Sequence, residues 1–249
     1  MGSISPPGIP RKTVLLATVA LTAAVAWLQP PLTARMGALG RVPATSLAGG
    51  TIIGVVTTKE AARPPLKITT DLGVCGATAP NESVVVDASG HTANAVITVT
   101  GVKAAAPAGV TVTNEKCRFI PHVALLKPSG NVKITSKDAV LHTTHAQMTG
   151  GGKFLFNVSL PIPNMVLSRP VDKAGVVQVV CNTHNWMRGW LVVTDELSAL
   201  SAGDGTYRLD NVPPGAHELR IWHEELKAAP VKVTVKEGET MTVNFTVGK

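Results

Sequence analysis

Short runs rich in valine, isoleucine and threonine, separated by turns, follow one another along most of this 249-residue chain. Several runs alternate apolar and polar residues, which is the pattern of a β-strand with one buried face. Aromatic residues make up only 4 % of the chain, and this scarcity favours strands over a helical bundle. The sequence therefore predicts an all-β protein built as a β-sandwich or barrel. The expected strands cover residues 50–56, 66–69, 82–86, 94–100, 110–112, 122–126, 131–135, 154–160, 175–180, 190–193, 206–209, 217–222, 231–235 and 240–247.

The N-terminus carries an apolar run of a different kind. Two basic residues precede the run at 13–28, which ends at a pair of prolines. A basic start and an apolar stretch of this length are typical of an export signal, because a membrane helix needs about 20 apolar residues. We expect a signal peptide at 1–34, with cleavage as late as residue 48, and a linker at 35–50. An uncleaved membrane anchor is the alternative.

Two folded units are expected after the linker, at 51–195 and at 196–249. The second holds only four strand-like runs in fewer than sixty residues. Four strands make a thin sandwich. This small β-sandwich unit is therefore expected to pack on the first unit or to borrow its opening strand.

One loop concentrates residues that bind soft metal ions. The run 181–187, CNTHNWM, contains the thiol of Cys181, the imidazole of His184 and the thioether of Met187. About forty residues earlier, His142 ends the segment DAVLH and supplies a second imidazole. Two imidazoles, one thiolate and a weak thioether form the ligand set of a mononuclear copper site that passes one electron.

The chain has three cysteines, and an odd number leaves one unpaired if a disulfide forms. Because Cys181 lies beside His184 and Met187, the simplest partition is a Cys75–Cys117 disulfide and a Cys181 thiolate on the metal. The alternative is one disulfide of unknown pairing and one buried free thiol. A disulfide agrees with export to an oxidising compartment.

The two ligand segments resemble those of cupredoxins, the family of plastocyanin, azurin and pseudoazurin. Cupredoxins take an early His from one strand, and then Cys, His and Met from the loop between the last two strands. The resemblance implies a Greek-key β-sandwich over 51–195 and one copper ion that alternates between Cu(I) and Cu(II). It implies His142, Cys181, His184 and Met187 as ligands, with His184 nearest to solvent.

Two features depart from plastocyanin. Met187 follows His184 after only two intervening residues, a spacing similar to that of the copper domain of cytochrome oxidase subunit II. That dinuclear site uses two loop cysteines, whereas this loop has only Cys181, so a mononuclear site is expected here. Thr143 stands where the family often has Asn, so the hydrogen bonds that hold the loop are expected to differ.

Three further residues are candidates for supporting roles or for an additional ligand. His145 lies three residues after His142, and in a regular strand the two side chains point to opposite faces. We therefore expect His145 at the rim of the site. His122 is expected to be a buried, hydrogen-bonded histidine more than a ligand, and Trp186 is expected to shield the metal.

The segment 204–215, DGTYRLDNVPPG, resembles carboxypeptidase regulatory-like (transthyretin-like) domains. These are small β-sandwiches without catalytic residues that accompany other domains in exported proteins. The resemblance implies packing or interaction and no chemistry of its own.

The function expected from these features is that of a periplasmic or otherwise extracytoplasmic one-electron carrier with redox proteins as partners. A copper-trafficking protein and a metal-free β-sandwich adaptor are the alternatives. We expect no enzymatic activity, because no His-x-His pairs for a trinuclear copper centre are present. The formal charge of +7 is dispersed along the chain, so nucleic-acid binding is not expected. Membrane contact is expected only through an uncleaved anchor.

Overall fold

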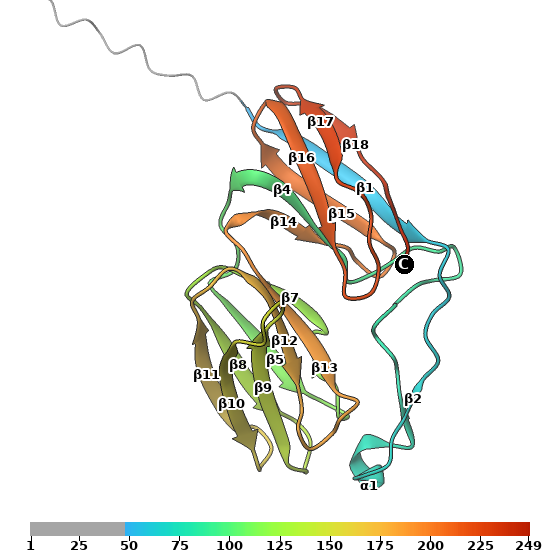
Figure 1. Ribbon diagram of the computed structural model, residues 1–249, viewed down its shortest axis with the longest axis vertical. Coiled ribbons are helices and arrows are strands. Elements are labelled where there is room, and N and C mark those ends of the chain that lie inside the picture. The colour runs from blue at the N-terminus through green and yellow to red at the C-terminus, as the bar shows by residue number, and fades with distance from the viewer. Residues whose placement is uncertain (1–47) are drawn as a thin grey trace, which may run out of the picture. The chain divides into compact units, whose positions relative to one another are not determined.

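The computed structural model describes residues 48–249, and within them it consists almost entirely of β-strands (Figure 1). The prediction of an all-β sandwich protein is confirmed. The predicted signal peptide at 1–34 and most of the linker at 35–50 lie outside the described residues. Within the described range, no helix is both long and apolar enough to span a bilayer.

The first sandwich is made of strands β5 to β13, which form two sheets around one core. One sheet has the order β10-β9-β12-β13-β7 and the other has the order β11-β8-β5-β6. Residues from both sheets meet in a single buried cluster. The strands are β5 (Gly109–Asn114), β6 (Phe119–Ile120), β7 (Val123–Leu126), β8 (Gly130–Ser136), β9 (His142–Met148), β10 (Phe154–Leu160), β11 (Val166–Val171), β12 (Gly175–Val180) and β13 (Arg188–Val193).

The second sandwich combines the C-terminal strands with two strands from earlier in the chain. One sheet contains β15-β1-β18, with β19 also pairing with β1, and the other has the order β14-β4-β16-β17. The strands are β1 (Gly50–Thr58), β4 (Val96–Lys103), β14 (Glu196–Leu200), β15 (Thr206–Val212), β16 (Gly215–Trp222), β17 (Val231–Val235), β18 (Thr240–Thr242) and β19 (Phe245–Val247).

The sheets therefore do not divide at the predicted boundary between residues 195 and 196. Strand β1 was expected from its sequence, and its residues alternate strictly between buried and half-buried. It runs antiparallel to β15 and parallel to β18 and β19. Gly54 allows the closest approach, because a Cβ at this position would lie 1.8 Å from the carbonyl oxygen of Val243. The second sandwich thus borrows β1, and in addition β4, from the range 51–195.

Residues 59–95, which we call the cap segment, connect β1 to β4 with little regular structure. They contain β2 (Leu66–Lys67), the short helix α1 (Leu72–Cys75) and β3 (Thr78–Ala79). The strand expected at 82–86 is absent from this segment, where Val86 makes only an isolated bridge to Thr92.

The runs expected from the sequence do not include five of the strands, which are β3, β6, β9, β11 and β14. Strand β11 contains Pro170, which masks its pattern but is tolerated because β11 lies at the edge of its sheet. Strand β14 is short, and every one of its residues is half-buried although they alternate polar and apolar as Glu-Leu-Ser-Ala. The proline therefore concealed β11 from the sequence pattern, and β14 has no fully buried face.

The two sandwiches meet around aromatic and titratable side chains. The rings of Trp190 and Trp222 pack edge to face with centroids 5.6 Å apart. The carboxylate of Glu224 accepts the indole N–H of Trp190 at 2.8 Å and is hydrogen-bonded to Nε2 of His122. His223 is buried beside them, and its Nδ1 accepts the backbone N–H groups of Glu225 and Leu226.

Acidification is expected to weaken this junction through His223. Burial lowers the pKa of His223 below its ordinary value of 6.5, although Glu224 and Glu225 raise it and His122 lowers it further. The unfolded chain then binds more protons than the folded one below about pH 6.5, so stability is lost as the pH falls from there towards the lowered folded pKa. The loss is at most about 1.4 kcal/mol per pH unit for one group.

Urea unfolding of metal-free protein at pH 7.5 and 5.5 measures this loss. His223→Asn keeps an acceptor near the Nδ1 position but does not titrate, so its stability is expected to fall less than that of the wild type. An equal fall in both proteins would assign the pH dependence to other groups.

Candidate metal centre

The pairing of three strands brings the predicted ligand segments together. Strand β12 pairs with β9 on one side and with β13 on the other, and Val180 lies opposite both His145 and Arg188. The loop between β12 and β13 therefore starts beside β9. Two backbone bonds close it, from the Cys181 N–H to the Met187 oxygen at 3.4 Å and from the Met187 N–H to the His184 oxygen at 3.0 Å.

Three donor atoms converge at this point, and all three residues are buried. The sulfur of Cys181 lies 3.7 Å from Nδ1 of His184 and 4.0 Å from Nδ1 of His142. The two Nδ1 atoms are 3.1 Å apart. Donors about 2.0 to 2.3 Å from one ion stand roughly 3.5 to 4 Å from each other, so this triangle has nearly the size that a metal ion needs.

Each histidine is oriented by an aspartate on its outer nitrogen. Nε2 of His142 lies 2.9 Å from the carboxylate of Asp138, which is buried and also accepts the backbone N–H groups of Lys116 and Cys117. Nε2 of His184 lies 2.9 Å from the carboxylate of Asp71. An imidazole that donates from Nε2 keeps its lone pair on Nδ1. Both Nδ1 lone pairs therefore face each other and the Cys181 sulfur.

The sulfur is held as a thiolate. Burial raises the pKa of Cys181, but the contact with the His142 ring and hydrogen bonds from the backbone N–H groups of Thr143 and His184 outweigh it and lower this pKa from 9.0 to about 6. The Thr143 N–H lies 3.4 Å from the sulfur, and its hydroxyl accepts the Asn182 N–H at 2.7 Å. Three unprotonated donors this close repel one another unless a cation lies between them. The donor set thus fits a soft metal ion such as copper.

Met187 and Trp186 lie against this group. Met187 is 2 % exposed and belongs to the same buried cluster as Cys181. Its role as an axial ligand stays a prediction. The ring of Trp186 packs 5.0 Å from that of His184 and donates its indole N–H to the carbonyl oxygen of Cys117 at 3.2 Å.

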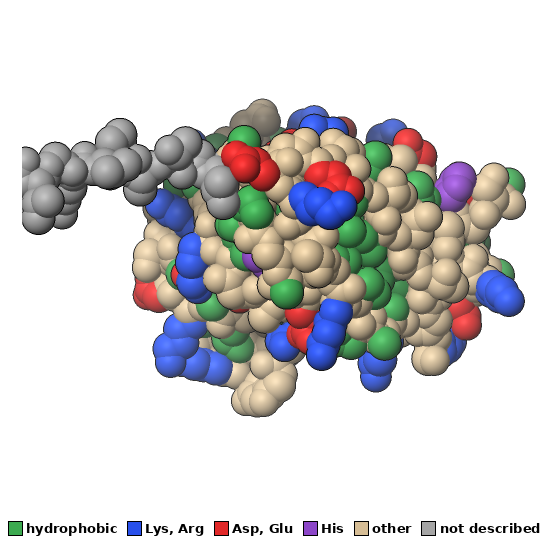
Figure 2. Space-filling model, turned by 90° about the horizontal axis from the view of Figure 1, so that it is seen from above, with side chains coloured by type: hydrophobic (Ala, Val, Ile, Leu, Met, Phe, Trp, Pro, Cys, Tyr) green, Lys and Arg blue, Asp and Glu red, His purple; other side chains and the backbone are tan. Residues whose placement is uncertain are grey.

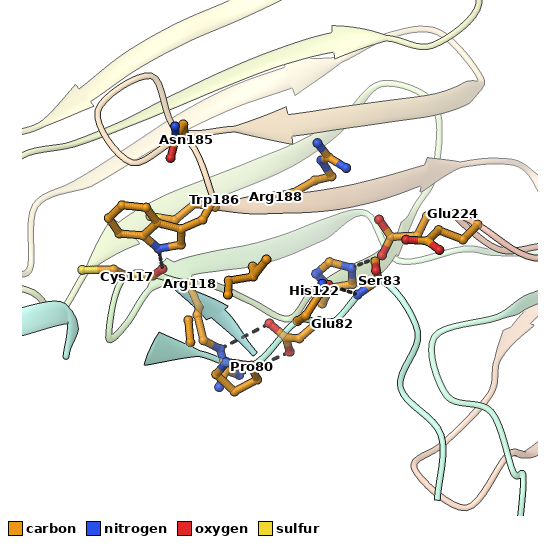
Figure 3. Close-up of a pocket in the computed structure, with 15 residues that line it drawn as sticks. Pro80, Glu82, Ser83, Cys117, Arg118, His122, Asn185, Trp186, Arg188 and Glu224 are labelled. Carbon is orange, nitrogen blue, oxygen red and sulfur yellow. Dashed lines mark hydrogen bonds and ion pairs between the residues drawn. The ribbon is translucent and has the colours of Figure 1, made fainter. Parts of the chain in front are cut away.

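The other predicted candidates are not part of the triangle. His145 points to the opposite face of β9 from His142 and packs edge to face on Phe154. His122 is buried and bonded to Glu224, as expected, and its Nδ1 has no partner among the described residues. It lines a pocket of about 240 Å³ together with Trp186, Arg188 and Glu82 (Figure 3).

The family resemblance implies that His184 is the ligand nearest to solvent, and in the structure this side chain is 0 % exposed, as is that of His142. Helix α1 and its preceding residue Asp71 cover His184, and the predicted disulfide between Cys75 and Cys117 ties this helix to the first sandwich. Asp71 has φ 52° and makes no capping bond to α1, so its carboxylate is free to reach His184. No sequence signal pointed to Asp71, which lies 113 residues from His184.

The buried aspartate is expected to control copper affinity more strongly than the exposed one. Asp138→Asn removes the charge that orients His142, and loss of such a partner typically weakens metal binding about 10–100-fold. Asp71→Asn is the matched comparison, and a smaller loss is expected because the Asp71 side chain is 40 % exposed. Competition with a chelator measures both affinities. Unchanged affinity in Asp138→Asn would contradict a role for this carboxylate.

Comparisons with known proteins find similar folds but no family assignment. No protein-family model matches the chain, and no curated protein matches it. Among solved structures, a mutant of amicyanin in its reduced state is 21 % identical, with a TM-score of 0.31, over 34 % of this chain and 82 % of the other. A purple cupredoxin from Nitrosopumilus maritimus is 22 % identical, with a TM-score of 0.31, over 35 % of this chain and 100 % of the other.

A copper-containing nitrite reductase from Thermus scotoductus SA-01 is 22 % identical, with a TM-score of 0.32, over 38 % of this chain and 24 % of the other. Likeness at these scores assigns neither family nor function. The case for a copper centre therefore rests on His142, Cys181 and His184 themselves.

Proposed function

We propose that the protein is an exported mononuclear copper protein that carries one electron at a time, and that it is not an enzyme. One observation carries this proposal. The Cys181 sulfur and the Nδ1 atoms of His142 and His184 lie 3.1 to 4.0 Å from one another. Copper would supply the Cu(II)/Cu(I) couple, and His142, Cys181 and His184 would hold it, with Met187 as a weak fourth ligand.

The surrounding residues suit fast electron exchange because they keep the ligands still. Asp138 and Asp71 fix the two rings, and the Thr143 N–H fixes the thiolate. Sites held rigidly by hydrogen bonds from a sheet scaffold change little when the charge of the ion changes. Such a site accepts and releases an electron with little rearrangement.

Export and redox protein partners belong to the same proposal. The apolar run at 13–28 supports export, and the Cys75–Cys117 disulfide agrees with an oxidising compartment. On the face that Figure 2 shows, Lys and Arg side chains lie scattered, several of them beside acidic ones. A diffuse charge of this kind steers protein partners more readily than it binds a nucleic acid.

Titration of the purified protein with Cu(II) tests the proposal by optical and electron paramagnetic resonance spectroscopy. We expect one equivalent to give an intense thiolate-to-copper band and the signal of a mononuclear Cu(II) ion, both reversible on reduction. Failure to bind either Cu(II) or Cu(I) would remove the metal hypothesis and leave a β-sandwich adaptor.

Copper trafficking without electron transfer is a second candidate, favoured by the covering of His184. Electron exchange weakens as the metal lies further from the protein surface. Asp71 and α1 cover His184, which the family resemblance implies is the ligand nearest to solvent. Tight Cu(I) binding without a visible Cu(II) band would support this candidate over the electron carrier.

A further inference from the structure

All three cysteines of the chain lie at the candidate copper centre. The sulfurs of Cys75 and Cys117 and one nitrogen of His184 lie within 4.8 Å of one another. The Cys117 sulfur also forms such a group with His142 and Asp138. The disulfide therefore borders both histidines. While its S–S bond is intact, it offers no thiolate to a metal.

We propose that reduction of the Cys75–Cys117 disulfide creates a second Cu(I) site beside the first, an inference that rests on the proposed copper function. A dithiol reductant transfers two electrons and two protons, leaving as its own disulfide, and Cys75 and Cys117 become thiols. Each thiol then releases its proton to solvent as its sulfur binds Cu(I). The two thiolates hold the ion, with His184 as the neighbouring imidazole.

The chemistry of the pair suits Cu(I). Thiolates are the soft ligands that select this ion, and Cu(I) accepts fewer ligands than Cu(II). Two sulfurs about 2.3 Å from one ion stand roughly 4 Å apart, and the Cα atoms of Cys75 and Cys117, 5.2 Å apart, allow this separation. Binding of Cu(I) to the reduced pair then brings three thiolates into one buried place. Two Cu(I) ions would offset the charge of two of them.

A reductant can reach the disulfide through local opening of helix α1. Helix α1 buries only Cys75, and Leu72 is 54 % exposed, so few side-chain contacts oppose local opening of this helix. Cys117 also lines the pocket of about 240 Å³ beside Trp186 and Arg118 (Figure 3). Its sulfur points away from the other labelled pocket residues in that view, so access of a reductant is expected through α1 and not through the pocket.

Anaerobic titration with Cu(I) against a coloured chelator tests the proposal on the oxidised protein and on protein reduced with a dithiol and then desalted. We expect one tightly bound equivalent before reduction and two after it, with thiol counting to verify three free cysteines in the metal-free reduced protein. Cys181→Ser is expected to gain one equivalent on reduction as the wild type does. The double variant Cys75→Ser, Cys117→Ser is expected to gain none.

Reduced wild-type protein that has three free thiols but binds only one equivalent would overturn the second site. This comparison needs no variant, so it decides the matter even if the double serine variant does not fold. Oxidised protein that binds no copper, combined with a gain of one equivalent on reduction, would reject the proposed function and keep the dithiol site. The two failures are therefore distinguishable.

Discussion

Cys181→Ser is expected to abolish the intense visible band of the copper-loaded protein completely. The band requires a thiolate bound to Cu(II). Cys181 is the one cysteine of the triangle, and the other two cysteines of the chain form the disulfide. A serine hydroxyl is a hard, protonated oxygen at neutral pH, so it cannot replace the thiolate as a ligand. The absorption spectrum after addition of one equivalent of Cu(II) measures the effect.

Met187→Leu is the control for this prediction. It keeps a similar volume beside Cys181 and removes only the thioether, so the band is expected to persist with an altered position. Urea unfolding of metal-free Cys181→Ser is expected to show a cooperative transition, with about 1–3 kcal/mol lost by burying a hydroxyl. A surviving band would exclude Cys181 as the ligand, and a collapsed fold would make it a structural thiol.

The fragment 196–249 is expected to be unfolded when it is produced alone. Its strands leave out β1, which supplies Ile52 and Val56 to the core of the second sandwich, and β4, which pairs with both β14 and β16. Without β1, strands β15, β18 and β19 have no common partner. Two or three strands without a covered apolar face are not stable in water.

Circular dichroism and urea unfolding compare this fragment with residues 48–249, for which a cooperative transition is expected. Adding a peptide that spans β1 does not restore β4, so it is expected to leave the fragment unfolded. A cooperative transition in 196–249 alone would show that its strands form a core without β1 and β4. That result would support the boundary predicted from the sequence.

Local pattern predicts strands and loop ligands here because both depend on neighbouring residues. The run of isoleucine and valine in 50–56 predicts β1, and the close spacing of Cys181 and His184 brings them together in one loop whatever the rest of the fold does. Alternation identifies the buried face of a strand but not its partner. The sequence therefore left two possibilities for the C-terminal unit, which were that it packs on the first unit or that it borrows the opening strand of that unit.

The contacts of the cap segment, apart from its disulfide, were beyond the reach of the sequence alone. Asp71 contacts His184 only because the Cys75–Cys117 disulfide and α1 bring a poorly patterned segment over the loop. The solvent exposure expected for His184 came from the family resemblance, which says nothing about the cap segment. Asp138 was visible as part of the segment before His142, but its bonds to Lys116 and Cys117 required the fold.

The pairing of β1 with β19 also sets an order in which the molecule can assemble. The hydroxyl of Thr58 bonds the carbonyl oxygen of Val247, 189 residues further along the chain. Because a chain emerges N-terminus first, an interval passes between the appearance of Thr58 and that of Val247. The strands from β5 to β13 are contiguous in sequence and can pair within that interval. The copper ligands on β9 and the β12–β13 loop can thus gather before β1, which anchors the start of the cap segment, finds its last partner.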